Sequence, residues 1–435
     1  MATASHPLTR ALEKAHPVVF STYAIAAAFT CYFCMYAFRK PFAAGTFDGS
    51  AEVPLAGAID LKILFIVAQV LGYCLSKFAG IKVISEMTPG RRALAILVVI
   101  AWAEGALALF GLLPRPYNAI AMFLNGVPLG MVWGLVFGFL EGRRVSEALG
   151  AGLSASYIVA SGAVKTVGRF VMDDFGVSEY WMPAVVGLMF APLMILCVWL
   201  LSRLPPPSAD DEKVRVKREP MDGRARAGFV RLFAPGLGLL TLLYIFLTAY
   251  RDFRDNFAVE IWSALGYSET PSIMTTSELP IAAGVLIVLA TLMGIRSNRK
   301  ALVVVHGVML GGSVLIGIST LAWQLGFLPP AAWMILVGLG LYIGYVPYGC
   351  VLFDRMIAAL GVVGTAGFMI YVTDSFGYLG SVGLLLYKNF GAPNLSWLDF
   401  FVGFSYVTSI LCSVCFVGAM IYFARKSREA PRQAD

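Results

Sequence analysis

The chain has 435 residues, of which 59% are hydrophobic and only 14% are charged. Soluble proteins carry about a quarter charged residues, so this composition and the mean hydropathy of +0.77 indicate a membrane protein. The net charge of +7 does not indicate nucleic-acid binding, because the basic residues are scattered over short loops between apolar runs. The expected partner is a lipid bilayer, and no nucleic acid is expected.

Apolar segments dominate the chain, and each is long enough, at roughly 20 residues, to cross a bilayer as a helix. In chain order these segments are 18–40, 58–79, 93–113, 119–140, 148–171, 180–202, 234–256, 275–295, 301–325, 331–353, 364–387 and 400–424. A proline-rich stretch of mixed charge, RLPPPSADDEKVRVKREPMDGRAR at 203–226, is typical of a solvated linker and separates six segments from six. The sequence predicts an all-α membrane protein with twelve transmembrane helices in two six-helix bundles.

Lys and Arg gather in alternate loops and in both tails, whereas the opposite loops carry mostly acids. This distribution predicts a multi-pass protein of the inner cell membrane with both termini cytoplasmic. The expected domains are an N-terminal tail, a first bundle, a linker, a second bundle and a C-terminal tail, at 1–17, 18–202, 203–233, 234–424 and 425–435. The polar N-terminus lacks a short apolar core with a cleavage site, so no cleaved signal peptide is expected.

Two pairs of cysteines, in CYFC (31–34) and CSVC (412–415), have CxxC spacing inside apolar segments. Neither pair has a nearby histidine or a second cysteine pair, so they are interpreted as small packing residues. The sequence predicts no metal and no cofactor.

The two halves of the chain resemble each other at a fixed offset of 214 or 215 positions. The matching pairs are FRKPF (38–42) with FRDNF (253–257), GIK (80–82) with GIR (294–296), GAGLSASY (150–157) with GTAGFMIY (364–371), and DFG ending at Gly176 with NFG ending at Gly391. Their common order indicates two homologous halves. Parallel repeats related by an axis along the membrane normal are expected to bring FRKPF and FRDNF to face each other across a central cavity.

Several charged residues fall inside the apolar segments, where a charge costs a few kcal/mol or more unless it faces a cavity or a partner. They are Arg39, Lys40, Lys77, Lys165, Arg169, Arg251, Asp252, Arg254, Asp255, Glu278 and Asp374. Each has a structural alternative: Arg39 could snorkel to the outer interface, and Lys77 could anchor the topology. Lys40, Lys165 and Arg169 are expected at the interface, and the charges at 251–255 could neutralise one another.

The functional interpretation is that one arginine from each half grips a shared anion, because guanidinium groups bind phosphate or carboxylate bidentately and stay charged. Arg251 and Arg254 are three residues apart and share a helical face, so either could serve as the partner of Arg39. Glu278 and Asp374 would then balance the positive charge or carry a proton.

These motifs resemble those of the major facilitator superfamily, and are most similar to its organophosphate:phosphate antiporter branch. The resemblance is carried by YAFRKPF (36–42), YCLSKF (73–78), TSELPIAAG (276–284), GTAGF (364–368) and FGYLGSV (376–382). It implies that Arg39 and one arginine of the seventh span hold a phosphate and that Tyr36 lines the cavity. It also implies that Lys77 and Glu278 lie near the pathway.

The chain departs from that family at several positions. Ser161 stands where the family has a histidine of the fifth helix, and Asp374 replaces a small residue. The spacing of the family favours Arg251 as the second arginine, whereas the internal repeat favours Arg254. The loop SEMTPGRR (85–92) keeps only a loose version of the facilitator signature.

The predicted function is secondary transport of a small organic anion, with an organic phosphate favoured, by alternating access in a monomer. The driving force would be exchange for inorganic phosphate, or protons carried through Asp374. One alternative is a proton-coupled carrier of carboxylates or amino acids, and another is a transport-inactive membrane sensor. An enzyme is not expected, because no nucleophile–base pair or metal cluster falls in the apolar segments.

Overall fold

The computed structural model describes residues 6–53, 57–85, 87–140, 146–206, 223–361 and 366–429. The chain divides into two compact units, Met1–Val216 (unit 1) and Lys217–Asp435 (unit 2). The boundary falls within the predicted linker 203–233, of which residues 207–222 lie outside the described residues. The domain bounds drawn from the sequence stay a prediction.

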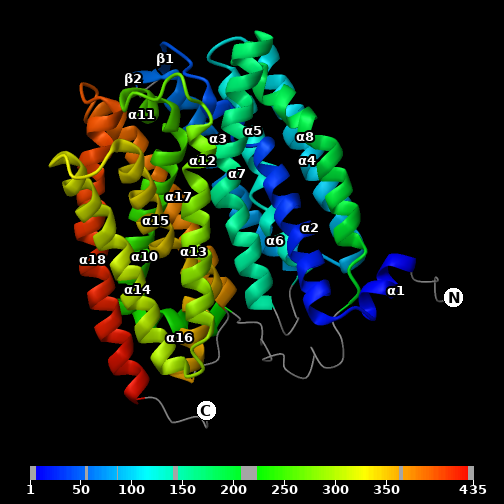
Figure 1. Cartoon of the computed structure of the whole chain (residues 1–435), viewed down its shortest axis with the longest axis vertical. Coiled ribbons are helices and arrows are strands. Elements are labelled where there is room, and N and C mark those ends of the chain that lie inside the picture. The colour runs from blue at the N-terminus through cyan, green and yellow to red at the C-terminus, as the bar shows by residue number, and fades with distance from the viewer. Residues whose placement is uncertain are drawn as a thin grey trace. The chain divides into compact units, whose positions relative to one another are not determined.

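The described residues of unit 1 form helices and one small hairpin (Figure 1). Its elements are α1 (Pro7–Glu13), α2 (Pro17–Ala37), η1 (Pro41–Ala44), β1 (Ser50–Val53), β2 (Gly57–Asp60), α3 (Leu61–Ser85), α4 (Pro89–Leu112), α5 (Asn118–Leu129), α6 (Val132–Phe137), α7 (Ser146–Phe175) and α8 (Met182–Ser202). The two strands pair antiparallel, with Ser50 opposite Asp60. The sequence predicted a helix from residue 58, whereas the structure has strand β2 there and begins the helix at Leu61. A short apolar run does not distinguish a strand from a helix.

The described residues of unit 2 form helices joined by short turns, with no strand (Figure 1). Its elements are α10 (Gly223–Asn256), α11 (Ala258–Ala264), α12 (Ile273–Thr276), α13 (Glu278–Met293), α14 (Asn298–Gln324), α15 (Pro330–Pro347), η2 (Tyr348–Leu352), α16 (Phe353–Leu360), α17 (Ala366–Phe390) and α18 (Trp397–Glu429). The long helix α10 bends at Phe233, whose backbone is not helical, two residues before Pro235. Proline removes a backbone donor, which accounts for the bend. The helix therefore begins inside the predicted linker.

Among the described residues, ten helical stretches are long and apolar enough to cross a membrane, and the chain is a multi-pass membrane protein. Helices α7 and α17 cover the predicted fifth and eleventh spans but are not among the ten. Both are rich in glycine and serine and carry charges, such as Lys165 in α7 and Asp374 in α17, which lower their hydropathy. A total of twelve spans stays a prediction.

Helices α3 and α5 of unit 1 approach each other closely at two glycines. A Cβ atom on Gly72 would lie 2.1 Å from the carbonyl oxygen of Phe123, and one on Gly126 would lie 2.1 Å from that of Gln69. Small residues permit such approaches between membrane helices. The close contact places Gln69 of α3 beside Asn125 of α5, and both side chains reach the end of α2.

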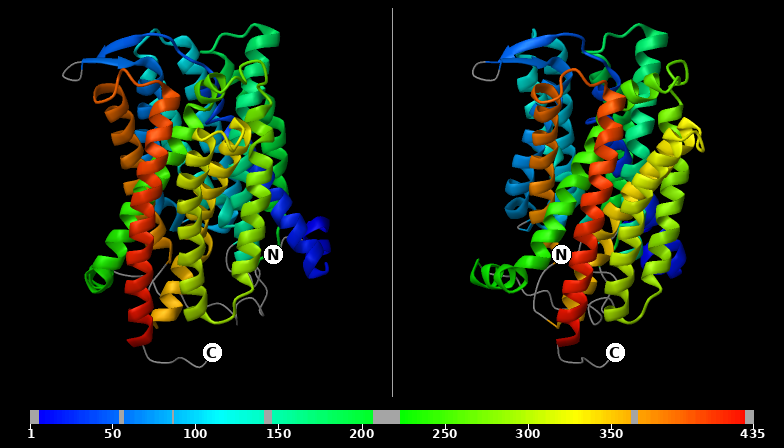
Figure 2. Two further views of the ribbon diagram at one scale, coloured as in Figure 1. Left: turned by 60° about the vertical axis from the view of Figure 1, so that its left-hand side comes forward. Right: turned by 90° about the vertical axis from the view of Figure 1, so that its left-hand side faces the viewer.

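The chain after FRKPF is held at the end of unit 1 where α7 meets α8 and where the β1–β2 hairpin projects (Figure 2). The Glu179 carboxylate accepts hydrogen bonds from the backbone N–H groups of Thr46 (3.2 Å) and Phe47 (3.0 Å). The buried ammonium of Lys62 donates to the carbonyl oxygen of Ala43 at 3.1 Å. These contacts fix the segment that carries Arg39 at its start.

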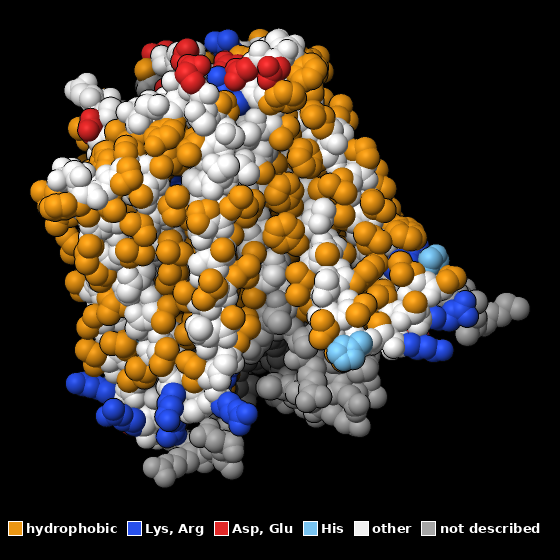
Figure 3. Space-filling view, in the orientation of Figure 1, with side chains coloured by type: hydrophobic (Ala, Val, Ile, Leu, Met, Phe, Trp, Pro, Cys, Tyr) orange, Lys and Arg blue, Asp and Glu red, His pale blue; other side chains and the backbone are white. Residues whose placement is uncertain are grey.

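On the face of unit 2 seen in Figure 3, Lys and Arg side chains gather below an apolar band, at the end where α14 begins and α18 finishes. The basic residues of these segments include Arg296, Arg299, Lys300, Lys426 and Arg428. They belong to the loop and tail predicted to be cytoplasmic, and the side of the membrane that they face stays a prediction.

Candidate functional site

Arg39 lies in the turn directly after α2, where its backbone N–H donates to the carbonyl oxygen of Tyr36 at 3.0 Å. It is 4% exposed, and its guanidinium carbon lies 3.9 Å from the centroid of the Tyr73 ring of α3. One turn further along α3, the buried ammonium of Lys77 lies 5.4 Å from the same centroid. The two cations therefore share one aromatic ring. Both side chains are buried, and whether they snorkel or anchor the topology stays open.

Two buried amide side chains hold the backbone beside Arg39. Gln69 donates to the carbonyl oxygen of Arg39 (2.9 Å) and to the amide oxygen of Asn125 (2.8 Å). Asn125 donates in turn to the carbonyl oxygens of Phe38 (2.9 Å) and Ala103 (3.1 Å). Because buried amides are costly unless hydrogen-bonded, this network fixes the end of α2 against α3, α4 and α5.

The buried charged side chains of unit 1, among the residues that the structure describes, are all basic. They are Arg39, Lys40, Lys62, Lys77 and Lys165. Lys40 and Lys165 are buried, at 4% and 3% exposed, and their depth in the membrane stays a prediction. Arg169 does lie nearer the surface, where it pairs with Asp173 at 3.0 Å. Buried cations of one sign raise the local concentration of anions.

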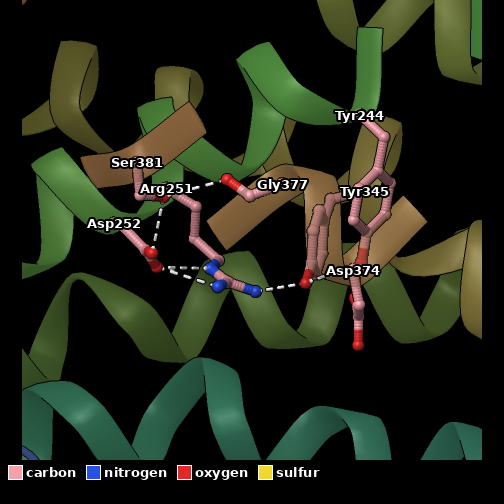
Figure 4. Close-up of polar contacts among 7 residues, drawn as sticks. All are labelled: Tyr244, Arg251, Asp252, Tyr345, Asp374, Gly377 and Ser381. Carbon is pink, nitrogen blue, oxygen red and sulfur yellow. Dashed lines mark hydrogen bonds and ion pairs between the residues drawn. The ribbon is translucent and has the colours of Figure 1, made fainter. Parts of the chain in front are cut away.

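In unit 2, Arg251 of α10 lies in a cluster of polar side chains from α10, α15 and α17 (Figure 4). Its guanidinium donates to Asp252 through Nη2 (2.8 Å) and Nε (3.1 Å). The other carboxylate oxygen of Asp252 accepts a hydrogen bond from Ser381 at 2.8 Å. The remaining Nη1 of Arg251 donates to the hydroxyl oxygen of Tyr345, whose ring centroid lies 4.6 Å from the guanidinium carbon.

The same cluster connects Arg251 to Asp374 through two tyrosines (Figure 4). The hydroxyl groups of Tyr345 and Tyr244 are 2.9 Å apart, and Tyr244 donates to Asp374. A phenol can donate one hydrogen bond and also accept, whereas a guanidinium only donates. Tyr244 donates to Asp374 and lies within hydrogen-bond distance of Tyr345, which accepts from Arg251. The chain of hydrogen bonds runs from the cation to the anion, and its members reinforce one another.

Arg254 lies in a different setting, on the side of α10 that meets α13 and α15. Its Nη1 forms an ion pair with Glu278 at 2.7 Å, and its Nη2 donates to the carbonyl oxygen of Met334 at 3.2 Å. Gly338 makes room for it, because a Cβ there would lie 2.8 Å from Nη2. The side chains of Arg254 and Glu278 are 5% and 10% exposed, so this pair is buried.

The structure thus brings Arg39 together with Lys77, Arg251 with Asp374, and Arg254 with Glu278. Tyr36 is half-buried one turn before Arg39, with its ring against Tyr32. That Arg39 faces an arginine of the other half stays a prediction. The sequence interpretation missed the partners Tyr73, Gln69, Asn125, Tyr244 and Tyr345. Gln69 and Asn125 could have been noticed as lone amides in apolar segments, but the tyrosines carry no such signal.

Comparisons with known proteins show the fold. The chain is similar to the crystal structure of a D-xylose-proton symporter with a TM-score of 0.60 and 14% identity, over 92% of this chain and 97% of that one. It is similar to a point mutant of the nucleoside transporter NupG with a TM-score of 0.59 and 12% identity, over 93% and 99% of the two chains. These likenesses establish a fold of the major facilitator type.

The organophosphate:phosphate antiporter branch stays a prediction, and no curated protein matches the sequence. Residues 41–426 match one protein family, described as "Family of unknown function (DUF5690)". This match covers most of the chain and includes the clusters around Lys77, Arg251 and Arg254. The chain therefore belongs to the DUF5690 family.

Proposed function

We propose that the chain is a secondary transporter of a small organic anion, with an organic phosphate as the favoured class, working by alternating access between two six-helix halves. The observation that supports this function is the basic interior of unit 1, where Arg39 and Lys77 lie buried on Tyr73. Buried charges in membrane proteins mark substrate or ion pathways. Arginine beside lysine suits a phosphate, which accepts several charge-assisted hydrogen bonds.

In unit 2 we assign anion binding to Arg251 rather than Arg254. An anion would have to displace Glu278 from Arg254, leaving a buried carboxylate without its partner, which is strongly unfavourable. Arg251 has a side chain that is 14% exposed, and its Nη1 donates to the neutral hydroxyl of Tyr345. A phosphate oxygen is a stronger acceptor than a phenol and would replace it.

Asp374 then senses the anion through the hydrogen-bond chain. When an anion takes the donor of Arg251, Tyr345 loses the partner that orients it, and the bonds through Tyr244 to Asp374 rearrange. Asp374 serves as the charge that balances Arg251 in the empty state, and Glu278 does the same for Arg254. Inorganic phosphate is the proposed counter-substrate. The transporter is a monomer of the inner membrane with both termini cytoplasmic.

Exchange in proteoliposomes tests the substrate class. Vesicles loaded with labelled inorganic phosphate are diluted into a panel of external organic phosphates, carboxylates, amino acids and uncharged sugars. Efflux stimulated by organic phosphates supports the proposal. Transport of carboxylates or amino acids alone would replace it with the carboxylate carrier, and binding without any flux would indicate a sensor. Arg169→Lys, which alters a partly exposed arginine paired with Asp173, is the matched control.

A further inference from the structure

Glu104 is an acidic side chain inside α4 that the proposed anion site does not include. It lies within the membrane-spanning stretch Gly90–Leu112, in the run AWAEGALAL. The residue is half-buried, and its Oε2 atom is fully buried and accepts no hydrogen bond from the residues that the structure describes. A carboxylate oxygen in this situation requires an explanation, because buried acceptors are nearly always paired.

The carboxylate fills the space beside a glycine of α8. A Cβ on Gly187 would lie 2.1 Å from Glu104 Oε2 and 3.2 Å from the ring of Phe38. Helix α4 packs against α5, α6 and α8. Helices α5 and α6 carry no titratable side chain, α8 carries only Cys197, and α4 itself carries Arg91 and Arg92 in its first turn. No cation of these four helices therefore faces Glu104 in the membrane-spanning stretch. The turn after α2, whose Phe38 lies beside Gly187, carries the buried cations Arg39 and Lys40.

An ionised carboxylate in such apolar packing costs several kcal/mol, and binding a proton removes the charge and most of that cost. We propose that Glu104 is a proton-binding site of unit 1. This part rests on the proposed function and adds a proton that accompanies each exchanged anion. The ligand class is thus the proton.

The network around Asn125 links Glu104 to the anion site. Asn125 donates both to the carbonyl oxygen of Ala103, the residue before Glu104, and to that of Phe38, the residue before Arg39. The Glu104 carboxylate and the Phe38 ring also lie on the same side of Gly187, since both are within 3.2 Å of a Cβ placed there. An ionised Glu104 competes with a substrate anion for the positive charges that follow Phe38 in the turn after α2. A protonated Glu104 does not compete. Proton and anion therefore bind together and cross in the same direction.

Infrared spectroscopy of the purified protein tests the proton without any substrate. The wild type is expected to show, at neutral pH, a protonated-carboxyl C=O band that shifts in deuterium oxide and is absent from Glu104→Gln. Glu104→Asp should restore a band, and the exposed Glu269→Gln should leave the wild-type band unchanged. A band that persists in Glu104→Gln, or its absence from the wild type, overturns the proposal.

Transport separates this proposal from the proposed function. Labelled inorganic phosphate is the probe, measured both as exchange and as accumulation driven by a pH gradient. In Glu104→Gln the ratio of accumulation to exchange should fall about tenfold, a usual size for coupling between two sites. An unchanged ratio overturns the assignment of Glu104 as the coupling group. A wild type that exchanges none of the anions, yet keeps the Glu104 band, overturns the proposed function and leaves the proton site standing.

Discussion

The two units hold their buried arginines in different ways. In unit 1, Arg39 lies on the ring of Tyr73 and its backbone is tied by Gln69. In unit 2, its counterpart in the internal repeat, Arg254, forms a buried ion pair with Glu278. The aromatic setting of Arg39 recurs one helical turn earlier, at Arg251, which lies over the ring of Tyr345. The internal repeat thus aligns Arg39 with Arg254 in the sequence. The aromatic surroundings of Arg39, however, are matched by those of Arg251.

The balance of charge differs as well. The buried charges of unit 1 are basic among the described residues, whereas unit 2 also buries Asp252, Glu278 and Asp374. We infer that unit 1 supplies the attraction for an anion, and that unit 2 supplies the hydrogen bonds that change when the anion arrives.

The largest effect is expected from breaking the ion pair of unit 2. Arg254→Ala leaves Glu278 buried without its cation, and removing one partner of such a pair costs about 3–5 kcal/mol. Thermal unfolding in detergent measures the loss. Arg254→Met combined with Glu278→Leu should recover most of it, because a buried pair is often replaceable by apolar residues. If Arg251→Ala destabilises the protein as much as Arg254→Ala does, the distinction between the two arginines is wrong.

A smaller loss is expected from the amide network of unit 1. Asn125→Ala removes a donor to two carbonyl oxygens and a partner of Gln69, which costs about 1–3 kcal/mol. Hydrogen exchange of the turn after α2 should increase, because Asn125 holds the backbone of Phe38. Asn118→Ala, at the start of the same helix, has no hydrogen bond to its side chain among the described residues and is the control. Equal exchange in both variants would contradict the role given to Asn125.

The smallest effect concerns the hydrogen-bond chain of unit 2. Tyr345→Phe keeps the ring over Arg251 but removes the hydroxyl group, at a cost of about 0.5–1.5 kcal/mol. It should also weaken the response of Asp374 to an anion, seen as a change in its carboxylate infrared band. Tyr348→Phe, which removes a hydroxyl that donates to the carbonyl oxygen of Leu240 at 3.1 Å, is the matched control. If Asp374 still responds to the anion in Tyr345→Phe, the series of hydrogen bonds through Tyr345 and Tyr244 does not carry the response.

The helices of both units follow from their apolar runs, because membrane helices must satisfy their own backbone hydrogen bonds. The importance of the charges in those runs was also predictable from the cost of burying them. Their partners were not: Glu278 lies 24 residues from Arg254, and Tyr345 lies 94 residues from Arg251. Which faces meet depends on how each helix is rotated, and a uniformly apolar helix gives no periodic signal of that rotation.

The most direct test of the account replaces each arginine by lysine, which keeps the charge but removes the bidentate fork. Apparent affinity for the exchanged anion is measured in proteoliposomes that contain equal amounts of folded protein. Arg39→Lys and Arg251→Lys should each weaken it about tenfold or more, whereas Arg254→Lys, still paired with Glu278, should keep it nearly unchanged. Loss of affinity in Arg254→Lys with full affinity in Arg251→Lys would contradict the assignment.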